Sequence, residues 1–157
     1  MEQRIYRGNF TPDLLADYLV QHYINQPEFT AQKLGEGKSL IVQIGEARNH
    51  NKREIQHAVT IGIAQNPENE TEIAVTLGEQ QWLTPDQAAY AIAMGALALL
   101  FTPWILFALL WPAAHILGTR ILPNDIWHNV ETFVITQGGV MVGSQILQHP
   151  HLGESKF

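Results

Sequence analysis

The spacing of apolar residues in the N-terminal half of the chain changes from a helical period to a strand period. Between Thr11 and Asn25, apolar residues recur every three or four positions, which is typical of a helix with one buried face. Thr11 can cap this helix, Pro12 can occupy its first position, and Asn25-Gln26-Pro27 can end it. We therefore predict a helix over residues 12–25. Its apolar face comprises Leu14, Leu15, Tyr18, Leu19 and Tyr23.

After Pro27, apolar residues alternate with small or polar ones, which is typical of strands with one covered face. Three strands are clearly indicated, residues 29–34 indicate a fourth, and residues 4–7 an edge strand. Short turns such as Asn66-Pro67-Glu68-Asn69 make neighbouring strands antiparallel. We expect an α+β domain over residues 1–84, with an antiparallel sheet of four to five strands covered by one helix. The core-facing strand residues are Leu40, Val42, Ile44, Val59, Ile61, Ile63, Ile73, Val75 and Leu77.

The second face of this sheet is built mainly from Ala, Thr, Gly and Glu. These side chains are too small to form a core by themselves. The face could receive another helix or a partner.

Residues 87–119 contain no Asp, Glu, Lys or Arg and are dominated by Ala, Leu, Ile, Phe and Trp. Such runs are rare in soluble proteins and typical of membrane segments. Thr84-Pro85-Asp86-Gln87 has the composition of a capping box, so we expect a helix to begin there. A single straight helix over this run would be about 50 Å long, which exceeds the ~30 Å hydrocarbon layer. We expect a break near Pro103, because proline removes a helical hydrogen bond.

Three arrangements of the hydrophobic segment 85–120 are open. A kinked helix could span the membrane, a helical hairpin bent near Pro103 could enter one leaflet and return, or two helices could cover the open face of the sheet. Arg120 stands at the C-terminal end of the segment, and the positive-inside rule slightly favours keeping it in the cytoplasm. This favours the hairpin if the N-terminal domain is cytoplasmic too. The side chains expected to contact the membrane are Leu97, Phe101, Trp104, Phe107, Leu110 and Trp111.

A further amphipathic helix is predicted over residues 121–139, where Gly138-Gly139 would end it. Its aromatic residues Trp127 and Phe133 could form an interface with the membrane, or they could pack on the sheet. Residues 140–157 have a mixed pattern, and we expect a loosely ordered tail.

Composition narrows the range of partners. The 157 residues carry a formal net charge of −6, which disfavours binding to nucleic-acid phosphates. The absence of cysteine removes thiolate metal sites and disulfides. The first residues lack the apolar stretch of a secretory signal, so we expect the N-terminal domain to be cytoplasmic. The expected partners are a lipid bilayer and a protein, either a different protein or a second copy held through the hydrophobic segment.

The sequence contains neither a nucleophile-elbow motif nor a zinc-binding helix motif. We predict no catalytic residue, no metal and no cofactor, and the sequence favours a protein that is not an enzyme. An enzyme would need a pocket that brings His22, His50 or His57 together with a carboxylate. The residues favour a non-enzymatic, membrane-associated accessory or protein-interaction subunit. The alternative is a module that binds a lipid or another apolar ligand beneath the helix 12–25.

The stretch RGNFTPDLLADYLV at 7–20, the hydrophobic segment and LPNDIW at 122–127 resemble a group of small uncharacterised bacterial proteins. Members of this group have an N-terminal α+β domain followed by a hydrophobic region that associates with membranes. Some end in a cysteine zinc ribbon, which this sequence lacks. The resemblance implies no activity and no site residues.

Overall fold

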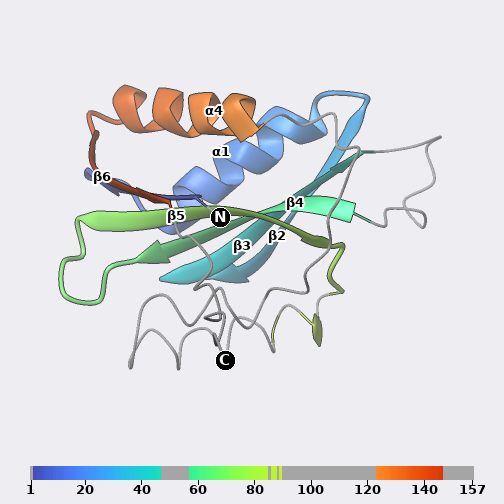
Figure 1. Cartoon of the computed structure of the whole chain (residues 1–157), viewed down its shortest axis with the longest axis horizontal. Helices are drawn as coiled ribbons and strands as arrows, with labels where there is room; N and C mark the ends of the chain where they lie inside the picture. The colour runs from blue at the N-terminus through green and yellow to red at the C-terminus, as the bar shows by residue number, and fades with distance from the viewer. Residues whose placement is uncertain (1, 47–56, 85, 88, 90–122, 147–157) are drawn as a thin grey trace, which may run out of the picture.

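The computed structural model describes residues 2–46, 57–84, 86, 87, 89 and 123–146. Within these ranges the fold is α+β, with an antiparallel sheet of six strands in the order β2-β3-β4-β5-β1-β6. Two helices, α1 and α4, lie on the same face of the sheet (Figure 1). The elements are β1 (Glu2–Arg7), α1 (Pro12–Ile24), β2 (Phe29–Glu36), β3 (Ser39–Glu46), β4 (His57–Gln65), β5 (Glu72–Gln81), α4 (Pro123–Thr136) and β6 (Val140–Ile146).

Helix α1 begins as its sequence predicts. The main-chain N–H of Leu14 donates to the Thr11 hydroxyl at 3.3 Å, and Pro12 occupies the first turn, where no intrahelical partner for an N–H exists. Leu15 and Leu19 are fully buried against the sheet, whereas Leu14 is 51% exposed. The predicted apolar face is therefore confirmed except at Leu14, which lies beyond the edge of the contact with the sheet.

Helix α4 ends at the predicted glycine pair. Gly138 has a φ of 75°, a left-handed conformation that side chains with a Cβ rarely adopt. The N–H of Gly139 donates to the carbonyl of Val134 at 2.8 Å, and the N–H of Gly138 donates to that of Ile135 at 2.9 Å. This pair of bonds is a Schellman motif, which satisfies two of the last carbonyls of the helix.

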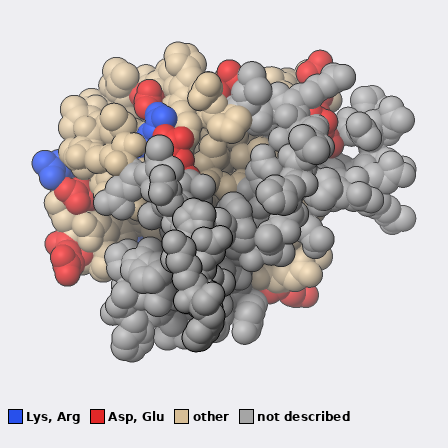
Figure 2. Space-filling model, viewed as in Figure 1, with Lys and Arg blue, Asp and Glu red and all other residues tan. Residues whose placement is uncertain are grey.

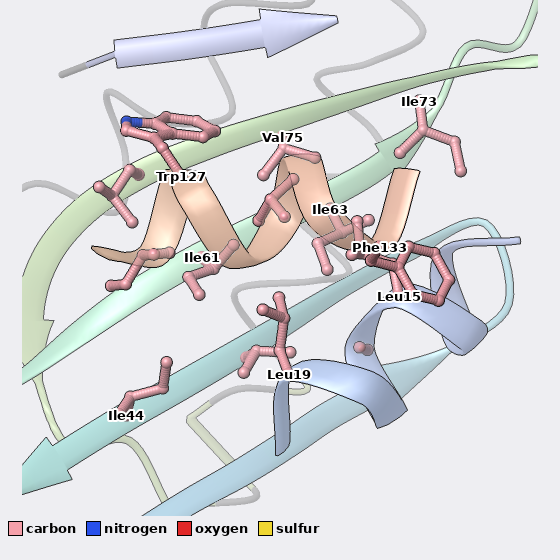
Figure 3. Close-up of a cluster of buried hydrophobic side chains, with 14 of the residues drawn as sticks. Leu15, Leu19, Ile44, Ile61, Ile63, Ile73, Val75, Trp127 and Phe133 are labelled. Atoms are coloured by element: carbon pink, nitrogen blue, oxygen red, sulfur yellow. The ribbon is translucent and has the colours of Figure 1, made fainter. Parts of the chain in front are cut away.

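The hydrophobic core lies between the two helices and one face of the sheet. Figure 3 shows Leu15 and Leu19 of α1 and Phe133 of α4 among the strand side chains. All nine strand residues predicted to face the core are buried in this single cluster. The alternating pattern of β3, β4 and β5 was therefore sufficient to assign their two faces.

The strand count and the position of β1 differ from the expectation. The prediction of a loosely ordered tail from residue 140 is wrong for Val140–Ile146, which form β6 and pair with β1. The prediction that residues 4–7 form an edge strand is also wrong, because β1 lies between β5 and β6. The strand state of β6 depends on this long-range pairing, since its own sequence contains glycine and serine and has no clear alternation.

The predicted hairpin or kinked transmembrane helix over 85–120 falls almost entirely outside the described ranges. Among the residues that are described, no helix is both long enough and apolar enough to cross a membrane. The start of the segment is described at Thr84 and Gln87. Thr84 N–H donates to the Gln87 side-chain oxygen at 3.1 Å, and Gln87 N–H donates to the Thr84 hydroxyl at 3.4 Å, which confirms the predicted capping box.

Candidate functional site

Two polar groupings stand out in the described part of the chain, and they lie on opposite faces of the sheet. One is a hydrogen-bonded network on the face without helices, centred on Gln43. The other is a cavity at the ends of α1 and α4. We call them the Gln43 network and the helix-end cavity.

The Gln43 network crosses three neighbouring strands. Gln32, Gln43 and Thr60 are paired in register across β2, β3 and β4, so their side chains share one face. Gln43 is completely buried; its amide nitrogen donates to the Thr60 hydroxyl at 3.1 Å, and its oxygen accepts from Gln32 at 2.9 Å. Because a buried amide without partners is costly, these bonds fix the orientation of Gln43.

The same network holds the chain just before the charge-free run. The main-chain N–H of Leu83 donates to the Gln43 oxygen at 2.9 Å, and the Leu83 carbonyl accepts from the Gln32 amide at 3.0 Å. The Leu83 side chain packs on Leu34 and Ile41, which form a second, smaller hydrophobic cluster. Residue 83 is therefore tied to the face of the sheet opposite the two helices.

The helix-end cavity has a volume of about 270 Å³. Its lining residues come from the last turn of α1, the start of β2 and the first turns of α4: His22, Tyr23, Gln26, Phe29, Asp125, His128 and Asn129. Asn129 donates to the Tyr23 hydroxyl at 3.0 Å and so joins the two helices here. The His22 ring stacks on Tyr18 and meets Tyr23 edge-on, which orients the imidazole.

This cavity brings a predicted histidine together with a carboxylate, as an enzyme would require. His22 and Asp125 line the same space, but among the described residues no hydrogen bond joins Asp125 to His22 or His128. No group of three potential metal ligands occurs in the described ranges either. At about 270 Å³ the cavity is just below the usual range for ligand pockets, so its size suits a small polar molecule or ion.

Two aromatic residues predicted as a possible interface, Trp127 and Phe133, are 2% and 7% exposed and belong to the core. Phe133 meets Phe10 edge-on at 5.5 Å between ring centroids. Both side chains are thus in contact with the domain itself. The six residues predicted to contact the membrane, from Leu97 to Trp111, are not among the described residues.

Trp127 also lies in a charged cluster between α4 and β1. The Arg4 guanidinium lies over the Trp127 ring, 4.4 Å from the centroid, and donates to Glu2 and Glu131. Trp127 Nε1 donates to the Glu2 carboxylate at 3.0 Å. On the face shown in Figure 2, the basic side chains lie next to acidic ones. The arrangement is that of a cluster in which charges are paired and hold α4 on the sheet.

Neither grouping was found from the sequence as a site. Gln43 is a single polar residue in an apolar strand. The alternation of that strand places Gln43 on the second face of the sheet but does not predict which residues it bonds. Asp125 and His128 belong to a helix whose position relative to α1 is set by packing. Comparison of the chain with family models, with curated proteins and with solved structures finds no match in any of the three.

Proposed function

We propose that this protein is a non-enzymatic, membrane-associated accessory or interaction subunit, which holds its α+β domain at the cytoplasmic surface through residues 85–120. The observation that carries this proposal is the tie between Gln43 and Leu83. It holds the chain at Leu83, just before a 33-residue run without charges, on one face of the sheet. In this proposal the tie at Leu83 limits how the domain can turn relative to the membrane that the run enters.

The non-enzymatic part of the proposal rests on the sequence, which has neither a nucleophile-elbow motif nor a zinc-binding helix motif. The imidazoles of His22 and His128 and the carboxylate of Asp125 line the helix-end cavity. The charged cluster at Arg4 is engaged in holding α4. In this proposal the domain is a folded unit for display or contact.

The alternative of a lipid carrier has less support. An apolar ligand beneath α1 would occupy the space between that helix and β3 and β4. Leu15 and Leu19 of α1 lie in this space and are fully buried (Figure 3). A lipid would have to displace these side chains, and the loss of a buried leucine from a core costs about 2–5 kcal/mol of stability.

Fractionation tests the proposal directly. We expect full-length protein in the membrane pellet and its release by detergent. A variant with Leu97→Glu and Phe107→Glu should move to the supernatant, because charges are costly in hydrocarbon. The matched control carries Leu14→Glu and Ile24→Glu, two exposed positions of α1, and should stay in the pellet. Wild-type protein that remains monomeric in a high-speed supernatant without detergent would overturn the proposal.

The hairpin and the single span differ in topology. Single cysteines placed at residues 50 and 145 of this cysteine-free chain report the side of each region. We expect labelling of both from the cytoplasmic side, because residue 145 lies in β6, which pairs with β1 of the N-terminal part of the sheet. Labelling from opposite sides would contradict both the hairpin and this pairing. We favour the hairpin, because β6 pairs with β1 and α4 shares a core with α1, so the chain before the run and the chain after it belong to one folded unit. Pro103 also divides the run into two short halves.

A further inference from the structure

The outer side of β6 is an open strand edge in the described part of the fold. β6 pairs with β1 on its inner side, and the sheet order places it at the end of the sheet. Figure 1 shows β6 following the C-terminal end of α4 and running back below that helix. An edge strand presents main-chain N–H and C=O groups that can pair with another strand. We call this surface the β6 edge, comprising Val140–Ile146.

Apolar side chains are concentrated at this edge. Val140, Met141 and Val142 are 58%, 53% and 42% exposed, and Ile135 at the end of α4 is 72% exposed. They are four of the six large apolar residues that are exposed in the described ranges. Single exposed apolar residues are ordinary, but a cluster of them at a strand edge is typical of an interaction surface.

The opposite edge of the sheet is protected by charge, and the β6 edge is not. On β2, the Lys33 ammonium lies 2.7 Å from Asp17 and 3.4 Å from Asp13, so that edge carries a charged network shared with α1. Charged side chains are a common defence against strand pairing. From residue 132 to residue 153 the sequence has no Asp, Glu, Lys or Arg.

We propose that the β6 edge pairs with the β6 edge of a second copy of this chain, antiparallel and around a two-fold axis. The reason for choosing a second copy is electrostatic. Each copy has a net charge of −6, so two copies repel as whole molecules, whereas β6 against β6 brings together no Asp, Glu, Lys or Arg. A foreign peptide would find no charged side chain on β6 to select it. An antiparallel strand pair is also compatible with the self-complementary geometry of a two-fold dimer.

The geometry limits the strength of this contact. The pairing of β1 with β6 is irregular between Ile5 and Tyr6, which leaves Val142 outside the register. Such bulges shorten the regular part of an edge. A short strand pair with a few apolar contacts is a small interface, so we expect a weak dimer with a Kd of about 10 µM to 1 mM.

Sedimentation equilibrium of the full chain, in detergent if detergent is needed for solubility, tests the dimer over a wide range of concentrations. Wild-type protein should shift from monomer to dimer, and Met141→Lys should weaken the association at least tenfold. The matched control is Leu14→Lys, which adds the same charge at a position of similar exposure, 51% against 53%, and should dimerise like wild type. A wild-type chain that stays monomeric, or equal behaviour of the two variants, would overturn the proposal.

A covalent test uses the absence of cysteine. Ser144→Cys lies on the exposed part of β6, and a mild oxidant should convert it into a disulfide-linked dimer. Ile24→Cys, on α1, should remain monomeric at the same concentration. Equal cross-linking of the two variants would mean that contacts between copies are random, and the proposal would fail.

Discussion

The side-chain oxygen of Gln43 accepts a hydrogen bond from the main-chain N–H of Leu83 at 2.9 Å, 40 residues along the chain. The same oxygen accepts from Gln32, and the amide nitrogen of Gln43 donates to Thr60. One buried amide therefore links two neighbouring strands and the chain that leads into the charge-free run. Removal of its polar atoms would take a hydrogen-bond partner from both the Leu83 N–H and the Thr60 hydroxyl.

We expect Gln43→Leu to destabilise the domain by about 1–3 kcal/mol, because Leu83 N–H and the Thr60 hydroxyl each lose a partner. Urea unfolding measures this change, and hydrogen exchange at Leu83 should become faster. Gln32→Leu is the control, since Gln32 is only partly buried and water can replace its bonds. An equal loss in both variants would show that the burial of Gln43 is not the cause.

Trp127→Ala should cost about 3–5 kcal/mol, because a core aromatic is lost together with its contacts to Arg4 and Glu2. Thermal or urea unfolding gives the value. Ile135→Ala on the same helix is the control, and its 72% exposure predicts a change within about 0.5 kcal/mol. A small effect of Trp127→Ala would contradict the placement of this side chain in the core.

The sequence was sufficient for the parts of the fold that depend on local pattern. Alternation gave the faces of β3, β4 and β5, and the Thr11-Pro12 pair gave the start of α1. The turn at Asn66-Pro67-Glu68-Asn69 is confirmed, with Glu68 N–H bonded to the Asn66 side chain at 3.0 Å. These features are decided within a few residues of chain, so a single sequence contains them.

The parts that were missed depend on contacts between distant residues. β6 is a strand because it pairs with β1, which lies more than 130 residues earlier in the chain. Nothing in the local sequence of β6 predicts that pairing. The helix-end cavity exists because Tyr23 and Asn129 meet across two helices. The partners of Gln43 follow from the strand register and from the path of residues 82–84. The spatial relation between distant segments was therefore the missing information in each case.

Gly138 and Gly78 allow the effect of backbone conformation to be measured apart from that of side-chain crowding. A Cβ added at Gly138 or at Gly78 would meet nothing within 4 Å, but only Gly138 has a positive φ, of +75°. We expect Gly138→Ala to destabilise by about 1 kcal/mol, whereas Gly78→Ala in β5 should be neutral or stabilising by up to about 1 kcal/mol. Denaturant midpoints of the two variants measure the difference. Equal midpoints would contradict the left-handed end of α4.

Tyr6 gives a prediction about pH. Its side chain is fully buried, and its hydroxyl has no hydrogen-bond partner in the described part of the structure. Burial raises the pKa of Tyr6 from 10.0 to about 12, because the charged phenolate is poorly solvated there. The folded state therefore holds the proton more tightly than the unfolded state. The stabilisation is complete below pH 10 and is lost as the pH rises from about 10 to about 12, by at most about 1.4 kcal/mol per pH unit.

Tyr6→Phe isolates this contribution. At neutral pH we expect the variant to be as stable as wild type or up to about 1 kcal/mol more stable, because a buried hydroxyl without a partner is removed. Between pH 10 and about 11.5 the wild type should lose stability more steeply than the variant, since a phenylalanine side chain has no group that ionises. Urea unfolding at several pH values compares the two slopes, and Tyr23, whose pKa is also raised by burial, contributes equally to both proteins. Parallel slopes would mean that Tyr6 ionises as readily in the folded protein as in the unfolded chain, which full burial of its side chain does not allow.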